Sequence, residues 1–273
     1  MIIDINNLEK LSYGQTSDVF ILDDTKVVKV FFDSIEQHII ENEYRVNKLI
    51  QSYGICVPTA YEMVDCGNRK GIVFQRVKNN TLNDEIARNQ KRYLDYAKIL
   101  ANEHAKINAI SDRQHDLPDQ KEAYANFIDS RISIDEKCKQ TLIAQLMSLP
   151  CDDKVCHGDF HPGNLLFDND KIFIIDWMGA TRGNPLLDVA GSCLIIKLMA
   201  TELTKMSFIK KKITSIFIKR FVDVYIKEYI KNSNLSMSEI NKWIPVKAVT
   251  YLDVGLPKNV NDRLLELIHT PTK

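Results

Sequence analysis

The fold can be read from the segment Val155-Cys156-His157-Gly158-Asp159-Phe160-His161-Pro162-Gly163-Asn164-Leu165-Leu166-Phe167, which Ile172-Phe173-Ile174-Ile175-Asp176-Trp177 follows closely. Two short apolar runs flank a polar turn that Gly and Pro interrupt. The run up to Phe167, the turn at Asp168-Asn169-Asp170 and the run up to Ile175 predict a β-hairpin. We expect this hairpin to hold Asp159, Asn164 and Asp176 close to one another.

These three side chains are the types that phosphoryl transfer requires. The protein has to supply a carboxylate for the acceptor hydroxyl and oxygen ligands for Mg²⁺. The five-residue step from Asp159 to Asn164 equals the step between base and metal ligand in the catalytic loop of protein kinases. We therefore predict Asp159 as the catalytic residue and Asn164 and Asp176 as metal ligands. The alternative is that Asp159 and Asn164 only cap a turn and Asp176 only ends a strand.

The motif resembles the aminoglycoside phosphotransferase and choline kinase family, which has a protein-kinase-like fold. Three elements carry the resemblance, in this order: the run from His157 to Asn164, the run from Ile174 to Trp177, and Asp188-Val189-Ala190. The resemblance implies an α+β, bilobal fold with a small antiparallel-sheet N-lobe that contains one helix and a larger, mainly helical C-lobe. It also implies ATP, or another nucleoside triphosphate, and Mg²⁺ as cofactors. The implied acceptor is a hydroxyl of a small molecule, for example an aminoglycoside, a choline-like or a sugar-like compound.

Bulk composition sets limits on partners and location. The 273 residues contain 36 Lys and Arg and 36 Asp and Glu, so no global charge favours nucleic acid or an anionic membrane. The six cysteines lack Cys-x-x-Cys spacing, and no basic and then apolar leader follows Met1, so we expect free thiols in the cytoplasm. The apolar stretch at 185–200 is too short for a membrane span and predicts a buried helix. The oligomeric state stays open.

A hairpin is predicted near the N-terminus. Its first turn, with Gln15, Thr16 and Ser17 after Gly14, could offer backbone N–H groups to phosphate oxygens. The returning strand carries Lys29, which alternation places on one face with Val27 and Phe31. An ammonium on such a face needs an anionic partner, unless the lysine lies on an edge strand and reaches water. By position, Lys29 matches the strand lysine of the family that contacts the nucleotide phosphates.

A helix is expected from about Ser34 to Tyr53, and either Glu41 or Glu43 on it could reach Lys29. The spacing in the family favours Glu43. Two further strands, at 60–65 and 71–77, complete a strand-rich region. Mainly helical patterns follow, so we place the lobe boundary near Lys78, with residues 1–78 as the nucleotide-binding lobe and 79–273 as the helical lobe that carries the catalytic loop and the acceptor site.

The resemblance also assigns residues beyond the catalytic loop. The segment from Gln75 to Lys78 becomes the hinge whose backbone pairs with adenine, which makes Gln75 and Val77 cofactor-binding residues. By family position, Asp188 should brace the catalytic loop. His157 is expected to be a buried support that orients Asp159, and we interpret His161 in the same way.

The remainder of the chain reads as helices. They are expected at about 93–110, 120–131, 135–147, 188–205, 208–231, 236–249 and 260–269. His104 lies on the apolar stripe of the first of them, so we interpret it as a hydrogen-bonded core residue rather than a catalytic one. The run Lys210-Lys211-Lys212 lacks interleaved aromatic residues and is read as a solvated helix face.

Two rival functions and the acceptor's identity stay open. A protein Ser/Thr kinase with a reduced C-lobe is disfavoured because only a dozen residues separate Asp176 from Asp188, which leaves no room for an activation segment. A nucleotide-binding pseudokinase scaffold is the other rival.

The identity of the acceptor also stays open. A quaternary amine would need an aromatic cage, to which Trp177, Trp243 and Tyr251 could contribute. A polycationic aminoglycoside would instead need carboxylates, which the tail at 268–273 lacks.

Overall fold

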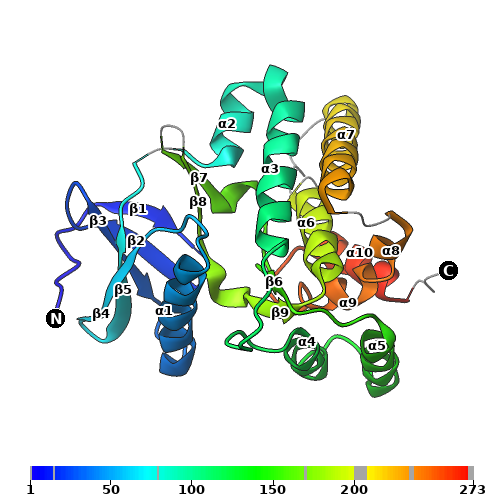
Figure 1. Cartoon of the computed structure of the whole chain (residues 1–273), viewed down its shortest axis with the longest axis horizontal. Helices are drawn as coiled ribbons and strands as arrows, with labels where there is room; N and C mark the ends of the chain where they lie inside the picture. Colours follow the sequence, from blue (N-terminus) through cyan, green and yellow to red (C-terminus); the bar gives the residue numbers. More distant parts are fainter. Residues whose placement is uncertain are drawn as a thin grey trace. The chain divides into compact units, whose positions relative to one another are not determined.

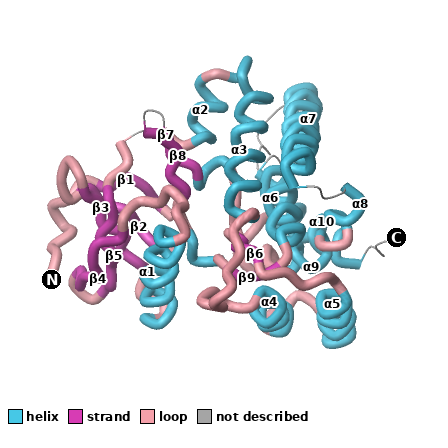
Figure 2. Tube along the Cα trace, in the orientation of Figure 1, coloured by secondary structure: helices cyan, strands magenta, loops and turns pink. Residues whose placement is uncertain are grey.

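The computed structural model describes residues 2–14, 16–78, 80–168, 171–199, 208–233 and 237–269. The chain forms two compact units. Unit 1 comprises residues 1–85 and 162–178, and unit 2 comprises residues 86–161 and 179–273. Strands dominate unit 1 and helices dominate unit 2, as Figure 2 shows. The α+β prediction, with an antiparallel sheet in the N-terminal part and helices after it, is confirmed.

Unit 1 is built on a five-stranded antiparallel sheet. Its strands are β1 (Lys10–Tyr13), β2 (Ser17–Ile21), β3 (Lys26–Phe31), β4 (Ala60–Cys66) and β5 (Arg69–Gln75), arranged in the order β1-β2-β3-β5-β4. β3 therefore lies in the middle, between β2 and β5. Its residues alternate between the two faces, so that Val28 and Val30 pack on one side and Val27 and Phe31 on the other.

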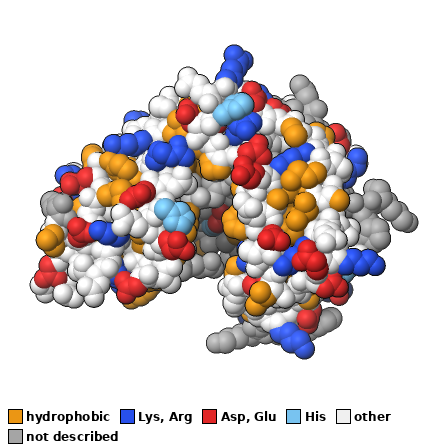
Figure 3. All heavy atoms as spheres, turned by 90° about the horizontal axis from the view of Figure 1, so that it is seen from below, with side chains coloured by type: hydrophobic (Ala, Val, Ile, Leu, Met, Phe, Trp, Pro, Cys, Tyr) orange, Lys and Arg blue, Asp and Glu red, His pale blue; other side chains and the backbone are white. Residues whose placement is uncertain are grey.

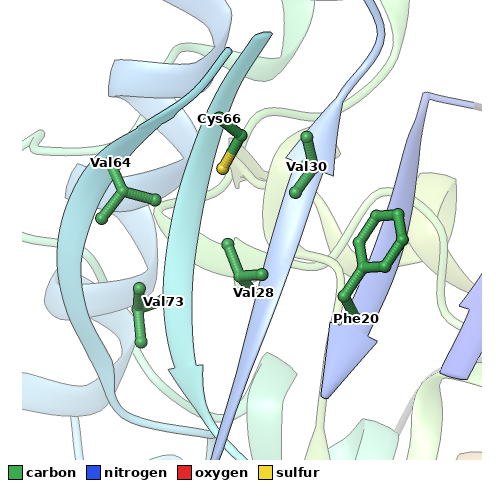
Figure 4. Close-up of a cluster of buried hydrophobic side chains, with 6 residues drawn as sticks. All are labelled: Phe20, Val28, Val30, Val64, Cys66 and Val73. Carbon is green, nitrogen blue, oxygen red and sulfur yellow. The ribbon is translucent and has the colours of Figure 1, made fainter. Parts of the chain in front are cut away.

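Both faces of this sheet are covered by apolar side chains. Figure 4 shows the first cluster, which consists of Phe20, Val28, Val30, Val64, Cys66 and Val73. The second cluster contains Val27, Phe31, Ala60, Ile72 and Phe74 together with Ile40. Ile40 belongs to α1 (Gln37–Ser52), so this helix covers the second face. Lys29 shares that face by alternation, which places its side chain on the α1 side of the sheet.

The predicted catalytic-loop hairpin is present in unit 1. After a short 3₁₀ turn, η2 (Pro162–Asn164), strand β7 (Leu165–Asp168) pairs antiparallel with β8 (Lys171–Ile174). Leu165 stands opposite Ile174, and the Ile175 N–H then donates to the carbonyl of Asn164 at 3.0 Å. Asn164 and Asp176 therefore flank the same open end of the hairpin. A second 3₁₀ turn, η3 (Trp177–Gly179), follows.

Unit 2 is a helical assembly with one small β-ladder. Helix α2 (Leu82–Arg88) lies across the boundary between the two units in the sequence. The other elements of unit 2 are, in chain order, η1 (Gln90–Arg92), α3 (Tyr93–Asn108), α4 (Gln120–Asp129), α5 (Glu136–Ser148), β6 (Lys154–Cys156), β9 (Thr181–Gly183), α6 (Pro185–Met199), α7 (Phe208–Ser233), α8 (Met237–Asn241), α9 (Ile244–Val249) and α10 (Lys258–His269). Helices α3 and α7 run side by side (Figure 1), and α9 packs against α6 and α10. β6 and β9 pair antiparallel on either side of the catalytic-loop sequence.

One helix prediction is wrong. The expected helix at 236–249 is two short helices, α8 and α9, with a break at Lys242 and Trp243; Ser236 itself lies outside the described residues. Pro245 explains the break, because proline lacks an N–H and is tolerated in a helix only in the first turn, and Pro245 lies in the first turn of α9.

The cysteines are free thiols. Cys56 and Cys151 are exposed, Cys138 is partly buried, and Cys66, Cys156 and Cys193 are buried. Burial raises the pKa of the Cys193 thiol to about 12 and raises those of Cys66 and Cys156 as well. Among the described residues, no helix has both the length and the hydropathy needed to cross a bilayer.

Candidate active site

An ion-pair cluster in unit 1 is centred on Lys29. Its Nζ lies 2.6 Å from Glu43 Oε1 and 3.2 Å from Asp176 Oδ1. Glu43 comes from α1 and is only 3% exposed, whereas the Asp176 side chain is 44% exposed. Of the two glutamates left open by the sequence, Glu43 is thus the partner of Lys29, and Glu41 instead accepts a hydrogen bond from Gln37.

Burial and charge act against each other in this cluster. Burial disfavours the ammonium of Lys29, but the Glu43 and Asp176 carboxylates outweigh it and raise the pKa of Lys29, so the ammonium stays charged. Burial raises the pKa of Glu43, although the Lys29 ammonium opposes that effect. Glu43 Oε2 is buried without a hydrogen-bond partner among the described residues. The cluster therefore holds one fixed positive charge between a buried carboxylate and an accessible one.

Asp176 and Asn164 offer oxygen atoms at the end of the β7–β8 hairpin. Asp176 adopts a left-handed backbone conformation with φ of 66°, which is uncommon for a residue other than glycine and concentrates at functional sites. Lys29 contacts only its Oδ1, and Oδ2 has no partner among the described residues. Asn164 is buried on the same hairpin end. One carboxylate and one amide oxygen, completed by phosphate oxygens and water, form the donor set that Mg²⁺ accepts.

Within the described residues, no group of three or more His, Cys, Asp or Glu side chains is arranged to hold a metal ion by itself.

The turn between β1 and β2 is tight, and Gly14 is required there. Its N–H donates to the Ser17 carbonyl at 2.8 Å, and a Cβ at Gly14 would lie 2.8 Å from that same oxygen. Ser17 is buried, and the Thr16 carbonyl accepts from the N–H of Phe32 at 2.9 Å. Gln15 lies outside the described residues. The backbone of this turn is therefore closely packed at Gly14.

The predicted hinge follows β5. The Gln75 side chain lies at the end of the strand, where its Oε1 is 3.4 Å from the Thr59 N–H, and the Gln75 N–H donates to the Thr59 carbonyl. Val77 is buried, and its backbone N–H has no hydrogen-bond partner among the described residues. Thr59 thus holds Gln75 in place, while the backbone at Val77 keeps an unused donor.

Asp159 lies on the catalytic loop in unit 2 and is positioned by two histidines. Its backbone N–H donates to Nδ1 of His157, which is fully buried, at 3.2 Å. Its Oδ2 lies 3.6 Å from Nε2 of His161. Burial opposes ionisation of Asp159, but His161 and the charge of Lys247 outweigh it and lower the pKa of the carboxyl. Asp159 is therefore an ionised carboxylate at neutral pH.

Asp188 braces this loop from α6. Its Oδ2 accepts from the His157 N–H at 2.6 Å and its Oδ1 from the Gly158 N–H at 2.8 Å. His104 Nε2 lies 2.9 Å from Oδ2, and His104 Nδ1 lies 2.6 Å from the Tyr225 hydroxyl. Burial opposes ionisation of Asp188, but His104 and these N–H donors lower its pKa well below the usual value. The structure thus shows Asp188 as the loop brace and His104 as a core histidine, as predicted.

Comparison with known proteins identifies the family. The model of the family described as "Phosphotransferase enzyme family" matches residues 7–206, which is well over half of the chain. The chain belongs to this phosphotransferase family. A curated relative, the mouse (Mus musculus) acyl-CoA dehydrogenase family member 10, is 24% identical over 239 residues, a match that covers 80% of this chain and 22% of the relative. The phosphotransferase thus spans about a fifth of the length of that relative.

Solved structures share the fold of this phosphotransferase. An aminoglycoside-3'-phosphotransferase of type VIII matches with a TM-score of 0.62 and 17% identity, covering 89% of this chain and 92% of the other. The amicoumacin kinase hAmiN matches with a TM-score of 0.63 and 13% identity, covering 96% of this chain and 86% of the other. A choline/ethanolamine kinase family protein from Mesorhizobium loti matches with a TM-score of 0.62 and 13% identity, covering 97% of this chain and 89% of the other. The predicted family and its kinase-like fold are confirmed.

Sequence reasoning missed one residue at the phosphotransferase loop. Lys247 of α9 is 4% exposed, and its Nζ donates to the Gly158 carbonyl at 2.6 Å. No local motif marks it, because its partner stands 89 residues earlier in the chain. The available signal was a lysine inside the otherwise apolar run Ile244–Val249, which predicts a buried cation.

Proposed function

We propose that the protein is an ATP- and Mg²⁺-dependent kinase that phosphorylates a hydroxyl group of a small molecule. The observation that carries this proposal is the position of Lys29 between Glu43 and Asp176. A lysine fixed on the central strand by a helix glutamate, with a second carboxylate beside it, is the arrangement that phosphoryl transfer uses to hold nucleotide phosphates next to a metal ligand. Family membership supports the same class of reaction.

Each candidate residue has a role in this proposal. Lys29 would contact the phosphates, and Glu43 would hold Lys29 in place. Asn164 and Asp176 would hold Mg²⁺, which when bound neutralises charge on the transferring phosphoryl group. Asp159 would orient the acceptor hydroxyl and accept its proton, which its lowered pKa permits at neutral pH.

Nucleotide recognition is proposed for the β1–β2 turn and the hinge. The turn, with Gln15, Thr16 and Ser17, would cover the phosphates, and the backbone at Gln75 and Val77 would pair with the base. The unused N–H of Val77 supports this assignment. The amicoumacin kinase hAmiN was solved with AMP-PNP and Ca²⁺, which is consistent with a nucleotide and a divalent cation here.

The acceptor is proposed to be a small molecule rather than a protein. The chain runs from Asp176 through η3 and β9 directly into α6, so this stretch contains no activation segment on which a peptide could dock. On the face in Figure 3, basic and acidic side chains are interspersed, which gives no single-sign surface there for nucleic acid. The free thiols support a reducing compartment such as the cytoplasm.

The aromatic cage considered from the sequence is not supported. Trp177 and Trp243 are each only 1% exposed, and the Trp177 indole N–H donates to the Ile174 carbonyl. Neither indole presents an open ring face to a quaternary ammonium group. We therefore propose a hydroxyl compound whose recognition does not depend on these two rings.

Asp159→Ala tests the proposal. ADP release by the purified chain is measured with ATP, MgCl₂ and a panel of aminoglycosides, amino alcohols and sugars. With an acceptor that the wild type phosphorylates, the variant should lose about 10²- to 10⁴-fold in kcat because the general base is removed. Asp223→Ala, at an exposed position on α7, is the matched control and should keep wild-type turnover. If Asp159→Ala retains wild-type kcat, the role of Asp159 is wrong.

A further inference from the structure

Lys247 is a buried cation with neutral partners. Its Nζ donates to the Gly158 carbonyl at 2.6 Å and to the Tyr124 hydroxyl at 2.8 Å. No carboxylate of the described residues lies within ion-pair distance of it. Burying an ammonium that has no direct counter-ion costs free energy of folding. Such a cost persists in a protein when the charge serves a purpose other than stability.

The Gly158 carbonyl belongs to the peptide bond that leads into Asp159. Both ends of this peptide are tied down, since the carbonyl accepts from Lys247 and the Asp159 N–H donates to His157 Nδ1 at 3.2 Å. Gly158 itself has φ of +85°, and a Cβ there would lie 2.1 Å from the Gly179 carbonyl oxygen. The orientation of the Asp159 backbone is therefore fixed by His157 within the loop and by Gly179 and Lys247 from outside it, and Lys247 supplies the contact on the carbonyl side.

Helix α6 is shaped to admit the lysine stem. A Cβ at Gly191 would lie 2.6 Å from Lys247 Cε and 3.3 Å from its Cδ. Glycine in a helix interior costs about 1 kcal/mol relative to alanine. Its presence at this point of α6 leaves the space through which Lys247 reaches the catalytic loop.

We propose that Lys247 is a positioning residue of the phosphotransferase, which fixes the peptide before Asp159 and holds its positive charge against the carbonyl of that peptide. This inference rests on the proposed function. It predicts that Lys247 acts on the chemical step and on the ionisation of Asp159, and leaves nucleotide binding unchanged.

Several groups act on the charge of Asp159, and all must be considered in its pH dependence. They are His157 and His161 on its own loop, Lys247 within α9, Tyr124 on α4, and Tyr251 after α9. The two histidines and Lys247 favour the ionised carboxylate. Removing the lysine charge should therefore raise the pKa of Asp159 and move the acidic limb of the activity profile to higher pH.

Lys247→Met tests the inference, because methionine keeps the unbranched stem and removes the charge and the hydrogen bonds. We expect kcat to fall about 10- to 100-fold through misplacement of Asp159. KM for ATP should stay within about twofold of the wild-type value, and the acidic limb of the plot of kcat against pH should move to higher pH. Lys242→Met, at an exposed position just before α9, should change none of these values. Wild-type kcat and an unmoved acidic limb in folded Lys247→Met would overturn the inference.

A second variant covers the case in which Lys247→Met does not fold. Gly191→Ala leaves Lys247 in the chain but places a methyl group against its stem, so kcat should fall and the acidic limb should move in the same direction. Unchanged values in Gly191→Ala would contradict the inference. Asp159→Ala separates the two proposals, since wild-type kcat in Asp159→Ala refutes the role that the proposed function gives to Asp159, whereas an inactive Asp159→Ala beside a fully active Lys247→Met refutes only the role of Lys247.

Discussion

At the scale of single residues, Asp188 holds the catalytic loop through several polar contacts. One buried carboxylate receives the N–H groups of His157 and Gly158 and contacts His104. Buried carboxylates are tolerated when every oxygen is hydrogen-bonded and a cationic or polar partner is close. The loop conformation around Asp159 therefore depends on a residue about thirty positions later in the chain.

Asp188→Asn should lower the free energy of unfolding by about 3 to 5 kcal/mol at pH 7, because the amide NH₂ group would face backbone donors in a buried site. The pKa of Asp188 is lowered in the folded state. The stability that it contributes is thus complete above its unfolded pKa, about 3.9, and is lost as the pH falls below that value. Urea denaturation at several pH values measures this difference.

Asp262→Asn on α10 serves as the control for this comparison, because Asp262 is exposed. It should leave the free energy of unfolding within about 0.5 kcal/mol of the wild type at every pH. A difference between wild type and Asp188→Asn that is the same at pH 3 as at pH 7 would contradict the account given for Asp188.

At the scale of elements, helix α4 has a well-defined start. Asp119 is its N-cap residue, and its Oδ1 accepts from the N–H groups of Lys121 and Glu122 at 2.9 and 3.1 Å. Its other oxygen lies 3.0 Å from the Arg182 guanidinium on β9. One side chain thus satisfies the first donors of a helix and ties that helix to the ladder beside the catalytic loop.

Asp119→Ala should reduce the free energy of unfolding by about 1 kcal/mol, because alanine cannot cap the exposed helix donors. Asp119→Ser should recover most of that loss, since serine is also a good N-cap residue, even though it no longer pairs with Arg182. Chemical denaturation of the three proteins checks both values. Equal losses for alanine and serine would show that the pair with Arg182, and not the cap, stabilises this helix.

Local sequence patterns were sufficient to predict the elements whose apolar residues recur with a strict period or whose ends are marked by turn residues. Alternation correctly placed Lys29 on the same face of the sheet as Val27 and Phe31, and the catalytic-loop hairpin lies where its turn residues predicted it. The prediction of one continuous helix at 236–249 was wrong, because the helical spacing of its apolar residues continues across the break before Pro245. Lys247 was missed for a different reason, since its role depends on a contact between distant segments that no window of sequence contains.

At the scale of the whole molecule, the proposed roles are divided between the two units. Lys29, Glu43, Asn164 and Asp176 belong to unit 1, whereas Asp159 belongs to unit 2. The chain crosses from one unit to the other between His161 and Pro162, within the motif itself. The residues proposed for nucleotide binding therefore form a group whose ligand can be tested independently of turnover.

Mg²⁺ and ATP together should raise the Tm of the wild type. At a ligand concentration 100 times Kd the gain is about 2.7 kcal/mol, which corresponds to about 5 to 10 °C for a chain of this size. Lys29→Met should lose most of this gain, because the ammonium that would hold the phosphates is absent. Excess EDTA should reduce the gain in the wild type. Thermal unfolding monitored by fluorescence measures each case.

Lys26→Met provides the matched control, because Lys26 stands on the same strand but packs its ammonium over the Tyr61 ring, 5.2 Å from the centroid, instead of against Glu43. This variant should keep the full nucleotide-dependent rise in Tm. If Lys29→Met and Lys26→Met respond to nucleotide equally, the assignment of Lys29 to the phosphates is wrong.

The distribution of cysteines offers a practical route to observing motion. Cys56 in unit 1 and Cys151 in unit 2 are the exposed thiols, whereas burial raises the pKa of Cys66, Cys138, Cys156 and Cys193 and so depletes their reactive thiolate form. A maleimide dye pair would therefore attach preferentially at one position in each half of the native chain. Energy transfer between the dyes could then report whether the distance between the two labelled cysteines changes when nucleotide binds, without any engineered attachment point.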